Sequence, residues 1–193
     1  MKRVLIVIAV AATFVVLQVT RPDIPGPGSD CEPIAAGILR QPGNASTSVV
    51  LLLAGVILAH SLHRARRMIG FGLLIAGTAA ALAHTTLHPW AFAADGVAAV
   101  IAVGLGVLAL PGAIIRPRLM VAAVVLGAAA ITLWALSRSG GPLCDPDAIL
   151  TGHAGWHLLV TLAAIVAAAS LTDSGVPAEA PTRPTLDAGH GPS

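Results

Sequence analysis

Long apolar runs, separated by short polar stretches, constrain the fold of this chain more than any other feature of its sequence. Runs of about 20 apolar residues are long enough to cross a bilayer as α-helices. Six apolar runs follow one another along the chain, at residues 4–19, 48–62, 68–87, 90–115, 119–136 and 149–171. The sequence therefore predicts an all-α fold, a polytopic membrane helix bundle with about six transmembrane helices.

The composition supports a membrane protein and argues against a soluble one. Charged residues make up 10% of the chain and hydrophobic residues 56%, whereas a soluble domain carries about 25% charged residues. The net charge is only +2, and the basic residues form short clusters between apolar runs. We therefore expect no nucleic-acid partner, while the oligomeric state stays open.

The first apolar run has two interpretations. Lys2 and Arg3 precede it, as in the basic start of a signal peptide. No small-residue cleavage site follows, which favours a retained helix or signal anchor. The expected organisation is an N-terminal transmembrane helix or signal anchor, an outer loop, a helical core and a disordered cytoplasmic tail, over residues 1–20, 21–47, 48–172 and 173–193.

The basic residues predict the orientation of the helices. Cytoplasmic loops of membrane proteins carry an excess of Lys and Arg. One set of alternating segments holds Lys2, Arg3, Arg64, Arg66, Arg67, Arg116 and Arg118, and the other holds Arg21, Arg40 and Arg138. We therefore expect an integral protein of a bacterial cell membrane with both termini in the cytoplasm.

Three histidines from two predicted helices fall at the same membrane level, near the outer face. His153 and His157 are four residues apart, so they share one face of a helix. His84, at the end of another apolar run, can supply a third nitrogen. Three histidines with an open fourth position form a catalytic zinc pattern. The alternative is that these are interfacial histidines without a ligand.

Asp95 is the only ionisable side chain in the run of residues 90–115. A carboxylate within a membrane costs free energy and marks a functional candidate. It can serve as the general base toward an attacking water, or it can orient a ligand histidine. The alternative is an aspartate stabilised by the dipole at the start of its helix.

Cys31 and Cys144 are the only cysteines, and the predicted topology puts both in outer loops. That compartment permits disulfides, so we predict a Cys31–Cys144 bridge, with two free thiols as the alternative. We also expect the small residues Ala83 and Gly155 to let the helices that carry the histidines approach closely.

The motifs together resemble a known family. Residues 84–87, Asp95 eleven positions after His84, and residues 153–157 look like the motifs of alkaline ceramidases. These belong to a wider superfamily of membrane hydrolases, often called CREST, that includes the adiponectin receptors. Residues 31–32 and 41–44 resemble the segment before the first core helix of ceramidase-like proteins.

This resemblance implies a zinc-dependent hydrolase that cleaves an amide bond of a membrane lipid. His84, His153 and His157 would match the Zn²⁺ ligands of the family. Asp95 would match the residue that holds the attacking water.

The chain also departs from the family pattern. Ala80 stands where the family has a serine, so Thr78 or Thr85 would have to replace its hydroxyl near the metal. Only Glu32 and Asn44 match the calcium-binding cluster of eukaryotic ceramidases. The family core has seven helices, and this chain looks two helices short.

Two other functions fit the same residues. A b-type haem protein would hold its iron between two histidines of facing helices, such as His84 with His153 or His157. A receptor or scaffold would keep the metal for stability only. These alternatives remain open at the level of the sequence.

Overall fold

The computed structural model describes residues 30–148 and 150–173, and these form a bundle of helices. The elements are α2 (Pro42–Ala59), α3 (Arg64–Thr86), α4 (Pro89–Leu108), β1 (Ala113–Ile115), α5 (Pro117–Leu136), α6 (Gly152–Ser170) and β2 (Leu171–Asp173). All five helices are long and apolar enough to cross a membrane. The predicted all-α membrane fold is confirmed. The first apolar run and almost all of the predicted tail lie outside the described residues.

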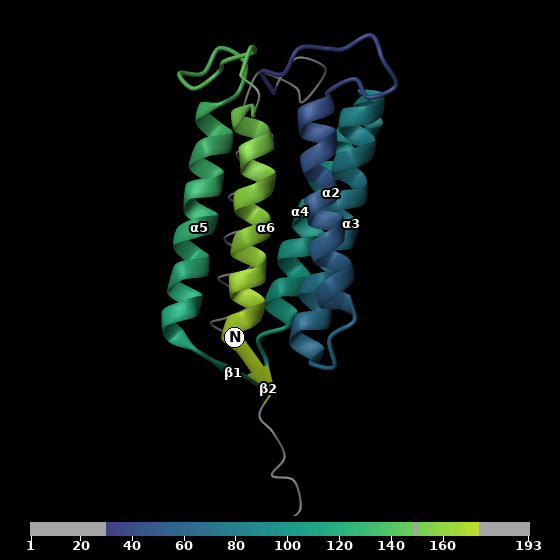
Figure 1. Ribbon diagram of the computed structural model, residues 1–193. Helices are drawn as coiled ribbons and strands as arrows, with labels where there is room; N and C mark the ends of the chain where they lie inside the picture. Colours follow the sequence, from purple (N-terminus) through teal and green to yellow (C-terminus); the bar gives the residue numbers. More distant parts are fainter. Residues whose placement is uncertain (1–29, 149, 174–193) are drawn as a thin grey trace, which may run out of the picture.

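The helices lie side by side, with the loops before α2 and α6 at one end and the two strands at the other (Figure 1). We call these the loop end and the strand end. Helix α2 packs on both α3 and α6, whereas α4 packs chiefly on α3 and α5 chiefly on α6. Helices α2, α3 and α6 therefore form the centre of the bundle, and α2 joins the two helices that carry the histidines.

Small residues set the spacing between helices, as is usual where lipid replaces water. A Cβ on Gly55 of α2 would lie 2.8 Å from the backbone nitrogen of Leu74 of α3. The expectation for Gly155 is wrong, because a Cβ at this position would meet only Leu133 of α5. Ala83 packs in a buried cluster with Leu87, Ala91 and Phe92.

Helix α2 begins at Pro42 rather than at residue 48, and so lies partly in the predicted outer loop. The reason is a carboxylate from outside the helix. Glu32 accepts hydrogen bonds from the backbone N–H groups of Gly43, at 2.5 Å, and Asn44, at 2.8 Å. It thereby caps two of the orphan donors at the helix start, and Pro42 suits the first helical turn.

Helix α4 ends at Leu108 rather than at residue 115. Pro111 cannot continue the helix, and Gly112 turns the chain with a φ of +79°. Residues 113–115 then pair antiparallel with Leu171–Asp173, with Ala113 opposite Asp173. This short ribbon ties the start of α5 to the end of α6 at the strand end.

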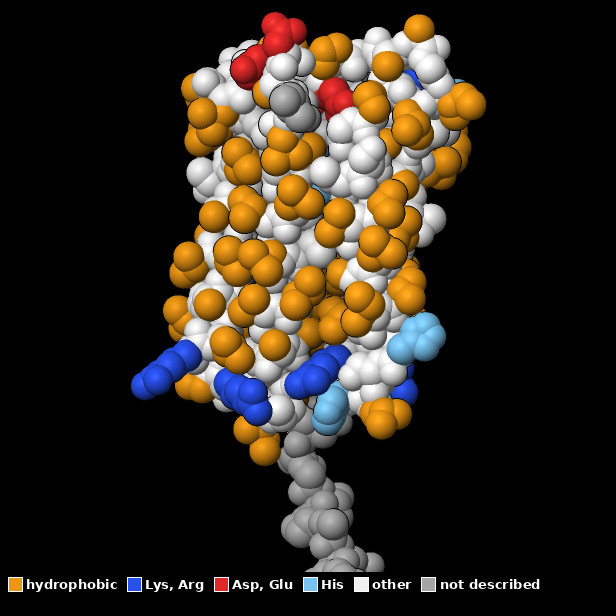
Figure 2. Space-filling model, in the orientation of Figure 1, with side chains coloured by type: hydrophobic (Ala, Val, Ile, Leu, Met, Phe, Trp, Pro, Cys, Tyr) orange, Lys and Arg blue, Asp and Glu red, His pale blue; other side chains and the backbone are white. Residues whose placement is uncertain are grey.

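Charge separates along the bundle axis. Figure 2 shows most Lys and Arg side chains near the strand end and the Asp and Glu side chains at the loop end, with hydrophobic side chains between. Arg64, Arg67, Arg116 and Arg118 are all exposed. This separation agrees with the charge pattern on which the predicted orientation rests, and the orientation itself stays a prediction.

Candidate metal centre

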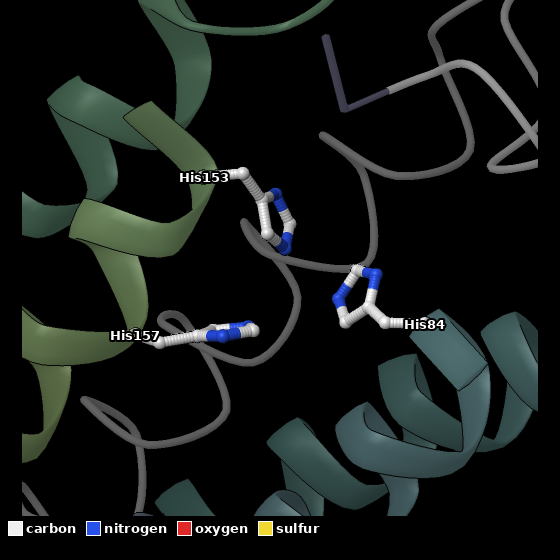
Figure 3. Close-up of side chains that lie close together, drawn as sticks. All are labelled: His84, His153 and His157. Carbon is white, nitrogen blue, oxygen red and sulfur yellow. The ribbon is translucent and has the colours of Figure 1, made fainter. Parts of the chain in front are cut away.

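The three predicted histidines converge at the loop end. One ligand nitrogen from each of His84, His153 and His157 lies within 4.8 Å of the other two. Their exposed fractions are 1%, 7% and 3%. Figure 3 shows the three rings pointing toward a common point, with ring centroids 4.9 to 5.4 Å apart. This buried group can hold a metal ion.

Helix ends place these rings. His84 lies in the last turn of α3, which ends where Leu87 adopts a left-handed conformation with a φ of 55°. His153 and His157 occupy the first two turns of α6 and share a face. Thr151 caps that helix, since its hydroxyl accepts a hydrogen bond from the backbone N–H of Ala154 at 3.2 Å.

Gln41 holds His84 in one tautomer. The Oε1 atom of Gln41 lies 2.7 Å from Nδ1 of His84, and the backbone N–H of Gln41 donates to the carbonyl of His84 at 3.0 Å. The amide Nε2 of Gln41 donates instead to the carbonyl of Glu32 at 3.5 Å. Because an amide oxygen only accepts, Nδ1 of His84 carries the proton and Nε2 keeps its lone pair.

Two hydroxyl groups of α2 hold His157 in the same tautomer. Its Nδ1 lies 3.0 Å from Oγ1 of Thr47 and 3.4 Å from Oγ of Ser48. Both hydroxyl protons already point to backbone carbonyls of the same helix, at 2.8 to 3.1 Å. The hydroxyl oxygens therefore accept from His157, and Nε2 is the nitrogen left for a metal.

Asp30 approaches the third histidine. Its Oδ1 lies 3.2 Å from Nδ1 of His153, and its Oδ2 lies 3.9 Å from Nδ1 of His84. Within the described part of the chain, the buried Nε2 atoms of His84 and His153 have no hydrogen-bond partner, and neither has Nδ1 of His153, because the nearby Asp30 is not in hydrogen-bond geometry. Leaving such an atom unpaired costs about 1–3 kcal/mol. A metal ion bound to the two Nε2 atoms would remove that cost, so the residues present fit a metal.

Asp95 lies on the side of α4 that faces the histidines. It follows Phe92 by three residues, so the two share a helix face. The ring of Phe92 lies 5.9 Å from the ring of His84. Asp95 is partly buried, and its carboxyl group is close enough to Asp30 for the two to interact electrostatically. Its catalytic role stays a prediction.

The predicted disulfide is confirmed. Cys31 and Cys144 are bonded, with their Cα atoms 5.5 Å apart, inside the range of about 7 Å that a disulfide spans. The bridge joins the segment before α2 to the loop before α6, close to the histidines of α6.

Among the other predicted residues, Asn44 contacts His157 through its backbone. Thr78 is exposed and donates to the carbonyl of Leu74 in its own helix at 2.8 Å, while Thr85 is partly buried. Glu32 caps α2, and both its oxygens accept from backbone N–H groups. The Oδ1 of Asn44 accepts from the hydroxyl of Thr151 at 3.1 Å, which joins α2 to α6.

Sequence reasoning missed four residues that contact the histidines: Asp30, Gln41, Thr47 and Ser48. They lie just before α2 or in its first turns. The predicted topology puts that segment at the same membrane level as the histidines, which was the one available signal. The topology alone does not show which of these side chains point inward. The predicted helix also begins at residue 48, so residues 42–47 are not recognised as helical.

Comparisons with protein-family models, with curated proteins and with solved structures find no match for this chain. The interpretation of the site therefore rests on its own residues and their geometry. The resemblance to alkaline ceramidases rests on the short motifs that carry it.

Proposed function

We propose that this protein is a zinc-dependent membrane hydrolase that cleaves an amide bond of a lipid. The observation that carries the proposal is the convergence of three buried imidazoles, two of which are held with Nε2 free. Three histidine ligands that leave a fourth position open are the pattern of catalytic rather than structural zinc sites. The resemblance to alkaline ceramidases adds the lipid amide as the substrate class.

The donor set suits a transition metal such as zinc and disfavours magnesium and calcium. Imidazole nitrogen suits zinc, copper, iron and nickel, whereas magnesium and calcium prefer oxygen ligands. Both cysteines are joined in the disulfide, so no thiolate competes as a ligand. A bound zinc ion would supply Lewis acidity, polarising a carbonyl and making water a better nucleophile near neutral pH.

The residues of the chain would do the remaining work. His84, His153 and His157 would hold the ion, and Asp95 would take the proton from the attacking water as general base. The ring of Phe92 packs against the ring of His84 in a T-shaped arrangement, with centroids 5.9 Å apart. Ala80 is buried one turn before His84 and offers no hydroxyl, so the proposed reaction proceeds without a serine at that position.

The surroundings of the site suit an amphipathic substrate. The outward sides of α4 and α5 are apolar and largely exposed, so an acyl chain can approach through the bilayer. At the loop end, a cavity of about 680 Å³ is lined by Glu32, Ile34, Leu150 and Thr47, among others. Thr47 also holds His157, so this mostly apolar cavity adjoins the site and offers room for part of a lipid.

The competing functions predict different arrangements. A haem with two histidine ligands requires the two rings on opposite sides of a large flat macrocycle. Here each of the three rings lies within 5.4 Å of the others, centroid to centroid, which suits one small ion. Replacing Asp95 distinguishes a scaffold with a structural metal from an enzyme. In a scaffold the replacement would change nothing, whereas in an enzyme it would remove the activity and leave the metal bound.

Elemental analysis of the purified full-length protein tests the proposal. We expect one zinc per chain, lost in His84→Ala and kept in the matched control His88→Ala. His88 is exposed at the same end of the bundle and stacks on Trp90. Protein that holds no zinc, even when zinc is supplied during expression, would contradict the proposal, as would a Soret band in its visible spectrum.

A further inference from the structure

A three-residue segment before α2 contacts one histidine of the cluster directly and the residues that hold the other two. The segment is Asp30, Cys31 and Glu32, and all three residues are buried, with exposed fractions of 5%, 8% and 7%. Two charged side chains and a half-cystine are an unusual set to bury at one place, because buried charges are costly unless they are paired. Their contacts explain why they are there.

Asp30 provides the contact to His153. Its Oδ1 is 3.2 Å from Nδ1, a close contact without hydrogen-bond geometry, and both Nδ1 and Nε2 of this ring are buried without a hydrogen-bond partner among the described residues. A histidine that binds a metal through one nitrogen commonly donates its other N–H to a carboxylate, which fixes the ring and raises its basicity. Asp30 lies at a distance from which it can accept this N–H of His153 after a small realignment of the ring. Gln41 and Thr47 already make the corresponding hydrogen bonds to His84 and His157.

Glu32 reaches the other two histidines indirectly. Its backbone carbonyl accepts from the amide of Gln41, which orients the Oε1 atom of Gln41 toward His84. Its carboxylate holds the first turn of α2 through the N–H groups of Gly43 and Asn44. One turn further along that helix is Thr47, the partner of His157.

Cys31 fixes the segment itself. It adopts a left-handed conformation with a φ of 63°, which is uncommon for a residue other than glycine. Its backbone N–H donates to Oγ of Ser139 at 3.1 Å, and its sulfur is bonded to Cys144. Both partners belong to the loop that leads into α6, the helix of His153 and His157.

We propose that Asp30–Glu32 is a clamp that positions the metal ligands, with Asp30 the positioning residue for His153 and the Cys31–Cys144 disulfide the bond that keeps Asp30 there. The inference rests on the proposed function, because it concerns the binding of zinc. It adds that zinc affinity depends on a carboxylate that does not bind the ion and on a disulfide whose sulfurs do not bind it. Loss of a carboxylate in this position costs 10- to 100-fold in metal affinity in other proteins.

The first test compares zinc affinities of the full-length protein in detergent, measured by competition with a chelator. Asp30→Asn keeps the shape and an acceptor oxygen, whereas Asp30→Ala removes both. We expect about a 10-fold loss for Asp30→Asn and a loss toward 100-fold for Asp30→Ala. The matched control is Asp147→Asn, an exposed aspartate in the loop after Cys144, which should bind zinc like the wild type.

The second test asks whether the disulfide acts through Asp30. We compare the Cys31→Ser/Cys144→Ser variant in the wild-type and in the Asp30→Ala background. If the disulfide holds Asp30 in place, opening it should weaken zinc binding about 10-fold in the wild type and by much less when Asp30 is already absent. This dependence separates positioning from a general loss of stability, which would lower the affinity equally in both backgrounds.

The outcomes separate the two proposals. Wild-type affinity in both Asp30 variants, in protein that binds zinc, would overturn the clamp and leave the proposed function standing. Equal losses on opening the disulfide in both backgrounds would remove the role given to the disulfide. A wild-type protein that binds no zinc would overturn the proposed function and the clamp together.

Discussion

The two ends of the bundle differ in what they bury. Thirteen polar or charged residues are buried in the described chain, and eleven of them belong to the loop end: Asp30, Glu32, Gln41, Asn44, Ser48, His84, Ser137, Arg138, Thr151, His153 and His157. Of the other two, Thr161 lies within α6 and Ser170 lies at the strand end, where the Arg side chains are mostly exposed.

This difference suggests that the strand end serves mainly stability and the loop end mainly function. The strand end is held by apolar contacts, such as the cluster of Ala65, Ile69, Ala109, Ala168 and Leu171, and by close helix packing at glycines. Polar groups buried in or near a membrane are expensive, so a concentration of them points to function. The comparison therefore predicts that substitutions at the loop end change metal binding and activity, while equivalent substitutions at the strand end change little.

The largest effect is expected for His153→Ala. It removes one of three ligand nitrogens, so zinc should no longer copurify with the protein. The matched control at the strand end is His60→Ala, which removes an exposed imidazole and should leave the zinc content at the wild-type level. Zinc content is measured by mass spectrometry of the purified protein. Equal zinc content in both variants would contradict the claim that only the loop end binds the metal.

The next effect is expected for Asp95→Asn. It keeps the size of the side chain and removes the base, so hydrolysis of a ceramide-like amide should fall by about 10²- to 10⁴-fold. Zinc content should stay unchanged, because Asp95 does not belong to the group of three ligands. Activity is measured by release of free fatty acid. If zinc is lost together with activity, Asp95 holds the site together rather than acting on substrate.

Opening the disulfide should have a smaller effect, on stability. Disulfides typically stabilise a fold by about 2–4 kcal/mol, and by more when they close a long loop; these cysteines are 113 residues apart in sequence. The Cys31→Ser/Cys144→Ser variant should therefore unfold at a lower temperature in detergent, measured with the metal removed so that zinc does not contribute. An unchanged unfolding temperature would show that the bridge constrains only local geometry.

The smallest effect is expected for Glu32→Gln. The amide can still accept through one oxygen, but it loses the negative charge next to the N–H groups at the start of α2. Loss of such a cap costs about 0.5–2 kcal/mol, visible as a modest drop in unfolding temperature. Arg67→Gln, an exposed substitution at the strand end, is the comparison and should leave stability unchanged.

Much of this architecture could be predicted from the sequence. Apolar runs predict the helices, and their alternating direction puts His84, His153 and His157 at one level, because the chain crosses twice between His84 and His153 and so returns to the same face. The i, i+4 spacing put two of them on one face. These inferences need only periodicity and topology, which are local properties of the chain.

The remainder depends on contacts between distant segments. The start of α2 depends on Glu32, which lies outside the helix. The hydrogen bond from His84 to Gln41 joins residues 43 positions apart, and the ribbon at the strand end joins residues 113–115 to 171–173. No local pattern encodes such partners, so Asp30, Gln41 and Thr47 became visible only in the folded chain.

X-ray absorption at the zinc edge of the purified wild-type protein tests the central claim most directly. The account predicts a zinc ion with three histidine nitrogens at about 2.0–2.1 Å and one further light ligand, and loss of this signal in His153→Ala. A protein without zinc after metal loading, or a zinc ion with sulfur ligands, would contradict it.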